Sequence, residues 1–254
     1  MPVNIFKAFA LGILQGVTEF LPISSSGHLV MAKEILGWEG PTLEFDVAVH
    51  LATLSVILWA FRREIWEIVK RPLSRKTLLV AIATVPTASL GLLVRTYFKG
   101  AFSSGTVSSL LLLLTGVFLW STKSFNGVKK EGETSMLDAL LVGLAQGIST
   151  LPGLSRSGLT ISTGLLRGLD RKWAGEFAFL LAIPVFLGAG LLEARSFQGN
   201  LPSIGAGMIG AFLSGLISLN SLMKWLREGK IHRFSFYCWG VGLGFLVYKL
   251  LLGH

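Results

Sequence analysis

The chain alternates long apolar stretches with short polar ones, a pattern that predicts membrane-spanning helices. A helix needs about 20 mostly apolar residues to cross a hydrocarbon core of about 30 Å. Two further apolar stretches, residues 3–36 and 135–168, are interrupted by Gly, Pro and Ser. The pieces on either side of each interruption are too short to span alone, so they predict re-entrant helix pairs. The six predicted spans are about residues 45–61, 78–94, 105–122, 177–194, 202–223 and 234–252.

Composition supports this interpretation. The 254 residues are 52% hydrophobic and 15% charged, with a mean hydropathy of +0.65, whereas a soluble domain carries about 25% charged residues. The predicted fold class is therefore an all-α polytopic membrane protein with six transmembrane helices and two re-entrant pairs. All 254 residues are expected to form a single integral membrane domain.

The net charge of +9 comes from basic residues in the loops between apolar stretches. Such residues are typical determinants of topology that face anionic lipid, so no nucleic-acid partner is expected. Of the 23 Lys and Arg residues, the loops at 62–76, 123–133, 167–172 and 224–233 hold 16. The predicted opposite side holds Lys7, Lys33, Arg95, Lys99, Arg195 and Lys249. This bias predicts that the four loops face inward and both termini face outward.

The two interrupted stretches resemble each other at an offset of 131 positions. Residues 1–123 form the predicted first repeat and residues 124–254 the second, each a re-entrant pair followed by three spans. An odd number of spans per half predicts an inverted-topology repeat whose re-entrant tips meet near mid-membrane. The coinciding residues are Gln15 and Gln146, Gly16 and Gly147, Ser24 and Ser155, Ser26 and Ser157, and Gly27 and Gly158.

The first interrupted stretch carries candidate chemistry. Glu19 lies in an apolar run, where a carboxylate costs at least about 2.5 kcal/mol unless it faces a cavity or a partner; capping of the next helix is the alternative. Gln15 lies one helical turn before it. Residues 24–27 open a helix and could cradle a phosphate, although N-capping needs only one serine. His28 is a candidate proton carrier, or a structural histidine.

The second stretch places Arg156 at its tip. A guanidinium there is costly unless it pairs with an anion, and its planar fork matches phosphate. Thr160 follows one turn later, on the same face. The alternative is a purely structural pair with Glu19. In either case Arg156 is expected within salt-bridge or one-water reach of Glu19.

Four further polar residues lie near apolar helices. Asp46 and His50, four apart, either line the site or lie at the interface. Glu44 and Glu176 are predicted to be first-turn acids of their helices, and Glu176 is also a candidate site-lining residue. A metal site from Glu19, His28, Asp46 and His50 would follow no dedicated metal-binding spacing.

Two motifs resemble one known family. Residues 15–29 resemble its first signature, in which Glu or Gln precedes Glu by four residues and a Ser-rich Gly-His turn follows. Residues 152–160 resemble its second, Pro-Gly-x-Ser-Arg-Ser-x-x-Thr, and residues 45–51 and 176–184 also fit. The family is undecaprenyl-diphosphate phosphatase of the bacitracin-resistance type, and the resemblance runs from the N-terminus to the last span.

The resemblance implies an enzyme of the bacterial cytoplasmic membrane. Its expected reaction removes the terminal phosphate of a C55 polyprenyl diphosphate and returns the monophosphate carrier to peptidoglycan synthesis, which confers bacitracin resistance. The implied partners are this lipid substrate and membrane lipids, with a homodimer as a further candidate. The site is expected to open on the outer face.

The resemblance also implies roles for particular residues. Glu19, Ser25, His28 and Arg156 are the expected catalytic residues. A divalent cation, Mg²⁺ or Ca²⁺, is the expected cofactor, with Glu19 as a ligand, and no organic cofactor is expected. Gln15 stands where many members carry Glu, which weakens any scheme with two carboxylate ligands. The expected substrate-binding residues are Gln15, Ser24, Ser26, Gly27, Ser155, Ser157 and Thr160.

Two alternatives stay open at this point. Ser25 is the expected nucleophile with Glu19 or His28 as its base, but an activated water could attack directly. Inverted repeats with broken helices are also typical of transporters, so a polyprenyl-phosphate flippase is the competing function.

Overall fold

The computed structural model describes residues 5–37, 42–193 and 201–252, and within them the chain is helical apart from connections and one isolated β-bridge between Lys129 and Leu169. The all-α prediction is therefore confirmed. The α-helices are α1 (Ile5–Phe20), α2 (Ser25–Leu36), α3 (Thr42–Ala60), α4 (Arg62–Lys70), α5 (Arg75–Tyr97), α6 (Gly105–Ser121), α7 (Met136–Ile148), α8 (Arg156–Leu166), α9 (Arg171–Glu193), α10 (Leu201–Arg227) and α11 (Phe234–Leu252). Short 3₁₀ helices are η1 (Lys99–Ser103), η2 (Thr122–Ser124), η3 (Glu131–Glu133) and η5 (Ile231–Arg233).

Several helices are long and apolar enough to cross a membrane. Among the described residues, four qualify alone, α5, α6, α10 and α11, and α3 with α4 makes a fifth if that bent pair is one span. The chain is thus an integral membrane protein. The predicted count of six stays a prediction, since α9 (Arg171–Glu193) includes residues 177–193 of the predicted span but is not among these helices.

Residues 62–70 form a helix, although the sequence analysis placed a loop there. Helix α4 leaves α3 at an angle of 75°. Ile65 and Ile68 pack on the core, while Trp66 is exposed with the Lys70 ammonium 5.1 Å from its ring centroid. An amphipathic helix that combines Trp with basic residues is typical of the lipid–water interface.

Helix α9 begins earlier than expected, so the first-turn assignment of Glu176 is wrong. The Asp170 side chain accepts the backbone N–H of Trp173 at 2.9 Å, which starts the helix at Arg171. Glu176 therefore lies in the second turn, where it pairs with Lys172 at 3.5 Å. Glu44 does lie in the first turn of α3.

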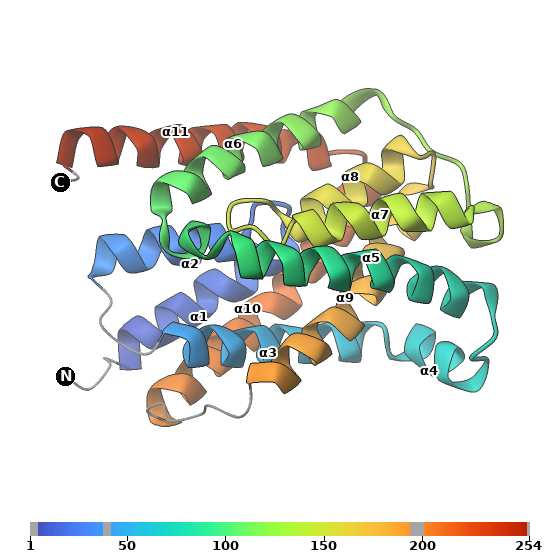
Figure 1. The fold of residues 1–254 in the computed structure, drawn as a ribbon, viewed down its shortest axis with the longest axis horizontal. Coiled ribbons are helices and arrows are strands. Elements are labelled where there is room, and N and C mark those ends of the chain that lie inside the picture. Colours follow the sequence, from blue (N-terminus) through green and yellow to red (C-terminus); the bar gives the residue numbers. More distant parts are fainter. Residues whose placement is uncertain (1–4, 38–41, 194–200, 253–254) are drawn as a thin grey trace.

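Both interrupted stretches form broken helix pairs, as predicted. The first pair, α1 and α2, and the second, α7 and α8, point toward each other from opposite ends of the molecule (Figure 1). Each break follows from its residues. Ser24 adopts φ 66° before α2, and Gly153 adopts φ 101° in the turn before α8. Ser24 and Ser155 then cap the second helix of each pair.

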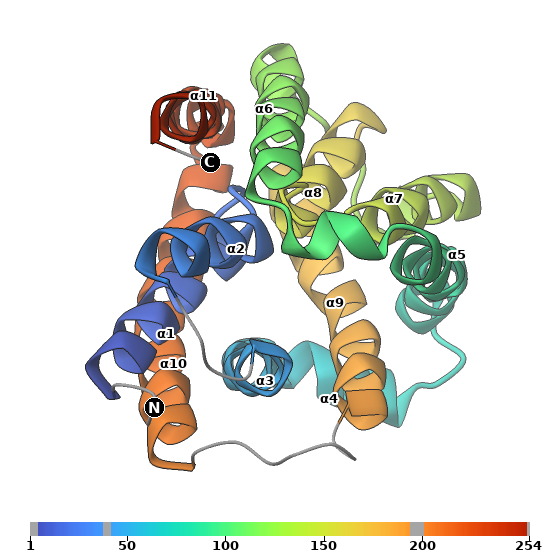
Figure 2. The same ribbon diagram turned by 60° about the vertical axis from the view of Figure 1, so that its left-hand side comes forward.

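Each pair packs its first helix on a span from the other half of the chain. Helix α1 lies along α10, and α7 lies along α5 (Figure 2). A Cβ on Gly12 would lie 2.0 Å from the Gly207 carbonyl oxygen, and one on Gly143 would lie 2.2 Å from that of Ala83. Gly12 and Gly143 are also 131 positions apart, so close approach of the backbones occurs at equivalent places in the two pairs.

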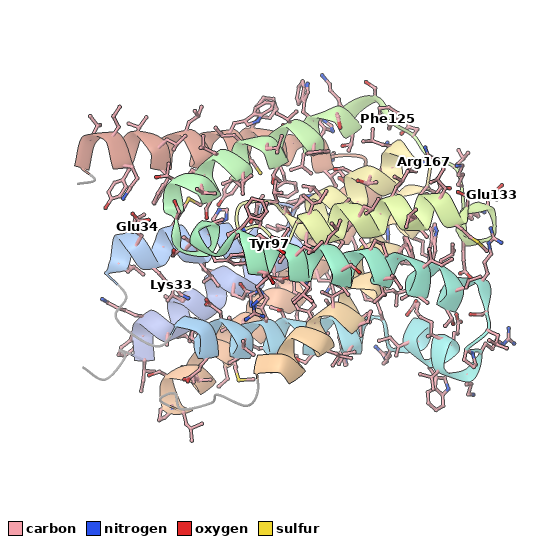
Figure 3. The ribbon with its side chains drawn as sticks, viewed as in Figure 1. Lys33, Glu34, Tyr97, Phe125, Glu133 and Arg167 are labelled. Atoms are coloured by element: carbon pink, nitrogen blue, oxygen red, sulfur yellow. The ribbon has the colours of Figure 1, made fainter. Side chains whose placement is uncertain are left out.

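The four basic loops gather at one end of the molecule. Arg75 donates to the Thr134 carbonyl at 2.6 Å, Lys129 N–H donates to Gly168 at 2.8 Å, and Arg171 donates to the Arg227 carbonyl at 3.3 Å. Glu133 and Arg167 mark this end in Figure 3, opposite Lys33 and Glu34. The prediction that these loops share a side is confirmed, although Arg195 of the opposite set lies outside the described residues.

Among the described residues, the opposite end carries fewer charges, and two of its lysines have partners. Lys249 near the end of α11 pairs with Glu34 at 2.5 Å, and Lys7 donates to the Leu36 carbonyl at 3.3 Å. Helix α1 begins and α11 ends here (Figure 1). The largest cluster of buried apolar side chains joins α3, α5, α9 and α10 with the broken pairs and surrounds the place where the pairs meet.

Candidate active site

The turns of the two broken pairs touch each other. The Ser24 hydroxyl oxygen accepts from the backbone N–H of Gly27 at 3.3 Å and from that of Gly153, in the other turn, at 3.0 Å. The Ser157 hydroxyl donates to the Leu21 carbonyl at 3.2 Å. The predicted meeting of the tips is confirmed: the turns of the two interrupted stretches, far apart in the sequence, are in contact.

Glu19 is the centre of the polar contacts there. Its side chain is only 6% exposed. One carboxylate oxygen, Oε2, accepts from the Ser25 hydroxyl and from Gln15 Nε2 at 2.8 Å, and lies 3.5 Å from His50 Nε2. The other, Oε1, lies 3.7 Å from Arg156 Nη2. The predicted approach of Arg156 to Glu19 is confirmed across 137 residues of sequence.

Arg156 keeps donor capacity beyond its loose pair with Glu19. Its Nη1 is buried and has no hydrogen-bond partner among the described residues. The guanidinium lies 3.9 Å from the ring centroid of Phe186, whose ring also contacts the ring of His50 at 5.8 Å. A buried cationic donor without a partner is costly. The arrangement therefore favours an anion at this place.

The second helices of both pairs begin at this site. Ser25 is the first residue of α2 and Arg156 is the first residue of α8. Ser24 and Ser155 satisfy one N–H of each first turn. Helix N-termini carry partial positive charge and free N–H groups, so two converging N-termini add to the attraction for a phosphate.

Two cavities adjoin these residues. A small one of about 10 Å³, lined by Glu19, Arg156, Ser157 and Thr160 among others, has the size of a single water site. A larger one of about 300 Å³ has Ser26, Asp46, His50 and Arg156 on its wall together with apolar side chains. The apolar part of its wall comes from Leu29, Val30, Val47, Leu51, Pro152, Val185 and Phe186.

The chain matches the family described as bacitracin resistance protein BacA over residues 8–244. It belongs to this family. The proteins most similar in sequence include an undecaprenyl-diphosphatase of Carboxydothermus hydrogenoformans, 45% identical, with 96% of this chain and 97% of that protein covered. Another is the undecaprenyl-diphosphatase of Halothermothrix orenii, 40% identical, with 96% and 98% covered. A third, from Treponema denticola, is 37% identical, with 96% and 97% covered.

In this BacA-family chain, several predicted site residues lie away from Glu19. His28 is buried, with Nδ1 2.8 Å from the Ser24 carbonyl oxygen and Nε2 3.1 Å from the hydroxyl of Tyr237 on α11. Its hydrogen bonds thus join α2 to α11 rather than reaching Glu19 or Ser25. Glu176 lies near the basic loops and pairs with Lys172, away from both cavities.

The remaining predicted residues serve the turns or the cavity wall. Thr160 donates to the Arg156 carbonyl at 2.6 Å and lines the small cavity. Asp46 pairs with Lys33 at 2.5 Å at the wall of the larger cavity. Phe186, which contacts both Arg156 and His50, was missed by the sequence analysis, because a phenylalanine within an apolar span carries no distinguishing signal.

The oxygen donors for a divalent cation are few in the BacA-family site. Among the described residues, no group of three or more His, Cys, Asp or Glu side chains is placed to hold a metal. Gln15 Oε1, however, is buried and has no hydrogen-bond partner within these residues, and Nε2 of the same amide contacts Glu19 Oε2 at 2.8 Å. One carboxylate and one amide oxygen fit a cation of the Mg²⁺ type, which usually completes its shell with water and substrate phosphate.

Proposed function

We propose that this chain hydrolyses undecaprenyl diphosphate to the monophosphate and inorganic phosphate. The observation that carries the proposal is Nη1 of Arg156, which is buried and has no hydrogen-bond partner in the described part of the chain, beside a Glu19 carboxylate that accepts from Ser25. The names of the relatives, undecaprenyl-diphosphatase, support the same substrate. The product is the lipid carrier that cell-wall synthesis uses again.

The site is suited to a diphosphate on an apolar chain. Arg156 and the two helix N-termini would hold the phosphates, since a guanidinium fork matches phosphate oxygens bidentately. The apolar wall of the 300 Å³ cavity would hold the first part of the prenyl chain. The Phe186 ring packs against the guanidinium of Arg156 and so restricts the orientation of the guanidinium.

In the proposed reaction the Ser25 oxygen attacks the terminal phosphorus. The Oγ–P bond forms, the bond from phosphorus to the bridging oxygen breaks, and the lipid monophosphate leaves with that electron pair. The hydroxyl proton passes to Glu19, with which Ser25 is already hydrogen-bonded. Water then attacks the phosphorus of the phosphoserine, the Oγ–P bond breaks, and Glu19 returns its proton to Oγ, so both water protons leave with inorganic phosphate.

Direct attack by water is the mechanistic alternative. The small cavity against Glu19 and Thr160 has room for one water molecule, and Glu19 would then take its proton. Both routes need the Glu19 carboxylate and the Arg156 guanidinium, because charge stabilisation and positioning dominate phosphoryl transfer.

We also propose a divalent cation, Mg²⁺ or Ca²⁺, as cofactor. The Glu19 carboxylate and the Gln15 amide oxygen would hold it together with substrate oxygens. When bound, it would neutralise charge on the diphosphate.

The architecture proposed for this function has six spans in two inverted repeats, residues 1–123 and 124–254. The opposed broken pairs and the equivalent close contacts at Gly12 and Gly143 support the repeat. The gathering of basic loops at one end supports an inward orientation of that end, with the termini and the site opening outward. A homodimer stays a prediction.

Detergent-solubilised protein tests the function against the flippase alternative. We expect release of inorganic phosphate from a polyprenyl diphosphate and formation of the monophosphate. Because no membrane is present across which a lipid could move, this release would show hydrolysis and not transport. The Glu19→Gln variant, purified in parallel, serves as the inactive control. Movement of labelled lipid in vesicles, with no phosphate release in detergent, would support a transporter instead.

A further inference from the structure

His50 lies against Glu19 in an orientation that its own helix fixes. Its Nδ1 lies 2.6 Å from the backbone carbonyl oxygen of Asp46, one turn earlier in α3. A carbonyl oxygen only accepts hydrogen bonds, so Nδ1 carries a hydrogen. The other ring nitrogen, Nε2, is thereby directed at Glu19 Oε2, 3.5 Å away.

The contact with Glu19 constrains this second nitrogen as well. An ionised carboxylate only accepts, so a bare Nε2 lone pair beside it would be repulsive. The carboxylate already accepts from Ser25 and Gln15 on the same oxygen. Because Nδ1 already carries a hydrogen, an N–H at Nε2 makes the ring an imidazolium, and its Nε2 then faces Oε2 as a charged donor at 3.5 Å.

We propose that His50 is a positioning residue of the phosphatase reaction, which holds the Glu19 carboxylate toward Ser25 by donating from Nε2. The proposal rests on the proposed function. Donors from Gln15, on the same helix as Glu19, and from His50, on α3, approach Oε2 from different elements. Together they restrict rotation of the carboxylate, and this restriction keeps it aligned with the Ser25 hydroxyl.

The surroundings of His50 favour this role over a general polar lining. The neighbouring carboxylate, Asp46, is paired with Lys33 at 2.5 Å, so Glu19 is the acidic partner left for the ring. Phe186 packs on the ring at a centroid distance of 5.8 Å and also contacts Arg156. His28 has no such contact, since its two nitrogens lie against Ser24 and Tyr237.

Two substitutions separate the ring nitrogens. In His50→Gln the amide nitrogen can reach the place of Nε2, whereas in His50→Asn it matches Nδ1 and leaves Glu19 without this donor. With solubilised protein and a polyprenyl diphosphate, we expect His50→Asn to lower kcat about 10- to 100-fold, the worth of one hydrogen bond to a charged group. His50→Gln should stay within a few-fold of the wild type, and KM should change little in both variants.

Ser55→Ala is the matched control. Ser55 lies on the same helix, is exposed, and donates to the Ala52 carbonyl at 2.6 Å, so its loss should leave kcat unchanged. Equal losses in His50→Gln and His50→Asn would overturn the proposal, as would a change confined to KM. Because Glu19 is also the proposed ligand of the divalent cation, all variants are compared at saturating Mg²⁺.

An infrared measurement keeps the test independent of turnover. The carboxylate band of Glu19 can be assigned from the difference between wild type and Glu19→Gln. We expect this band to shift in His50→Asn and to stay near its wild-type position in His50→Gln. A band insensitive to both substitutions would contradict the contact itself, whereas absence of phosphate release from wild-type protein with the expected band shifts would contradict only the proposed function.

Discussion

The two broken helix pairs share a framework but differ in the chemistry they carry. In both, a serine caps the second helix by accepting the N–H of a glycine three residues on, Gly27 after Ser24 and Gly158 after Ser155. In both, a glycine of the first helix lets the backbone of a span from the other half approach closely. These shared residues account for the shape of the turns.

The difference lies at the positions that face the meeting point. The first residue of the second helix is Ser25 in one pair and Arg156 in the other. Glu19 corresponds to Thr150, 131 positions later. Gln15 donates to the Glu19 carboxylate, whereas Gln146 donates to the Leu181 carbonyl at 3.2 Å. One framework used twice thus supplies the proposed nucleophile and base, Ser25 and Glu19, from one copy and the guanidinium of Arg156 from the other.

The strongest test of this division is Ser25→Ala. We expect turnover to fall roughly 10⁴-fold or more, the scale on which loss of a nucleophile acts. Ser26→Ala, next to it, should have a mild effect, because Ser26 lines the larger cavity without contacting Glu19. Phosphate release at saturating substrate measures both. Similar mild losses would favour direct attack by water.

Glu19→Gln should follow, with a loss of about 10²–10⁴-fold, the usual contribution of a positioned acid–base group. The amide keeps the shape and can still accept from Ser25, so the protein should remain folded. The measurement is kcat at several pH values beside a thermal unfolding curve. Retained activity at any pH would assign the base role elsewhere.

Arg156→Lys tests the contribution of the second pair. We expect a loss of about 10²-fold, because an ammonium keeps the charge but not the planar fork. The neighbouring Phe186 would also lose its stacked partner. Turnover and KM for the diphosphate are the measurements, and a nearly normal lysine variant would exclude bidentate recognition.

The shared framework predicts equal effects on stability. Gly12→Ala and Gly143→Ala should each destabilise the protein by about 1–3 kcal/mol, since the added methyl would meet a backbone carbonyl that cannot move aside. Gly100→Ala is the control, since apart from its chain neighbours no heavy atom of the described residues lies within 4 Å of the added carbon. Thermal unfolding in detergent measures all three, and a large difference between the first two would weaken the repeat.

The smallest expected effect separates the two caps. Ser155→Ala should cost about 0.5–2 kcal/mol, the usual worth of an N-cap. Ser24→Ala should cost more, because that hydroxyl also holds Gly153 of the other turn. The comparison again uses unfolding temperatures. An equal cost would show that the bond between the turns adds no stability.

Much of this site could be predicted from the sequence. The breaks around Pro22 and Pro152 follow from residues that cannot continue a helix, and they produced the expected helix pairs. The cost of a lone charge in hydrocarbon predicted that Glu19 and Arg156 would approach each other, and they do. The breaks follow from local composition and the approach of the two charges from their cost in hydrocarbon, and both can be predicted without a structure.

Other features depend on packing between distant elements. The contact of His50 with Glu19 depends on the orientation of α3 about its own axis. Because α3 is apolar with no clear polar face, the sequence does not show which side of the helix faces Glu19. His28 carried the stronger motif, yet its ring turns toward Tyr237, 209 residues away. The start of α9 was misplaced because Asp170 was not recognised as its cap.

The bend between α3 and α4 bears on the depth of the site in the bilayer. If α4 lies along the inner interface, His50 stands ten residues up α3 from Ala60, or about 15 Å, which is half the thickness of a hydrocarbon core of about 30 Å. A change in bilayer thickness would then leave the distance from the inner leaflet to the site unchanged. It would instead lengthen or shorten the path to the outer surface, so acyl-chain length should affect the entry of the diphosphate more than the chemical step.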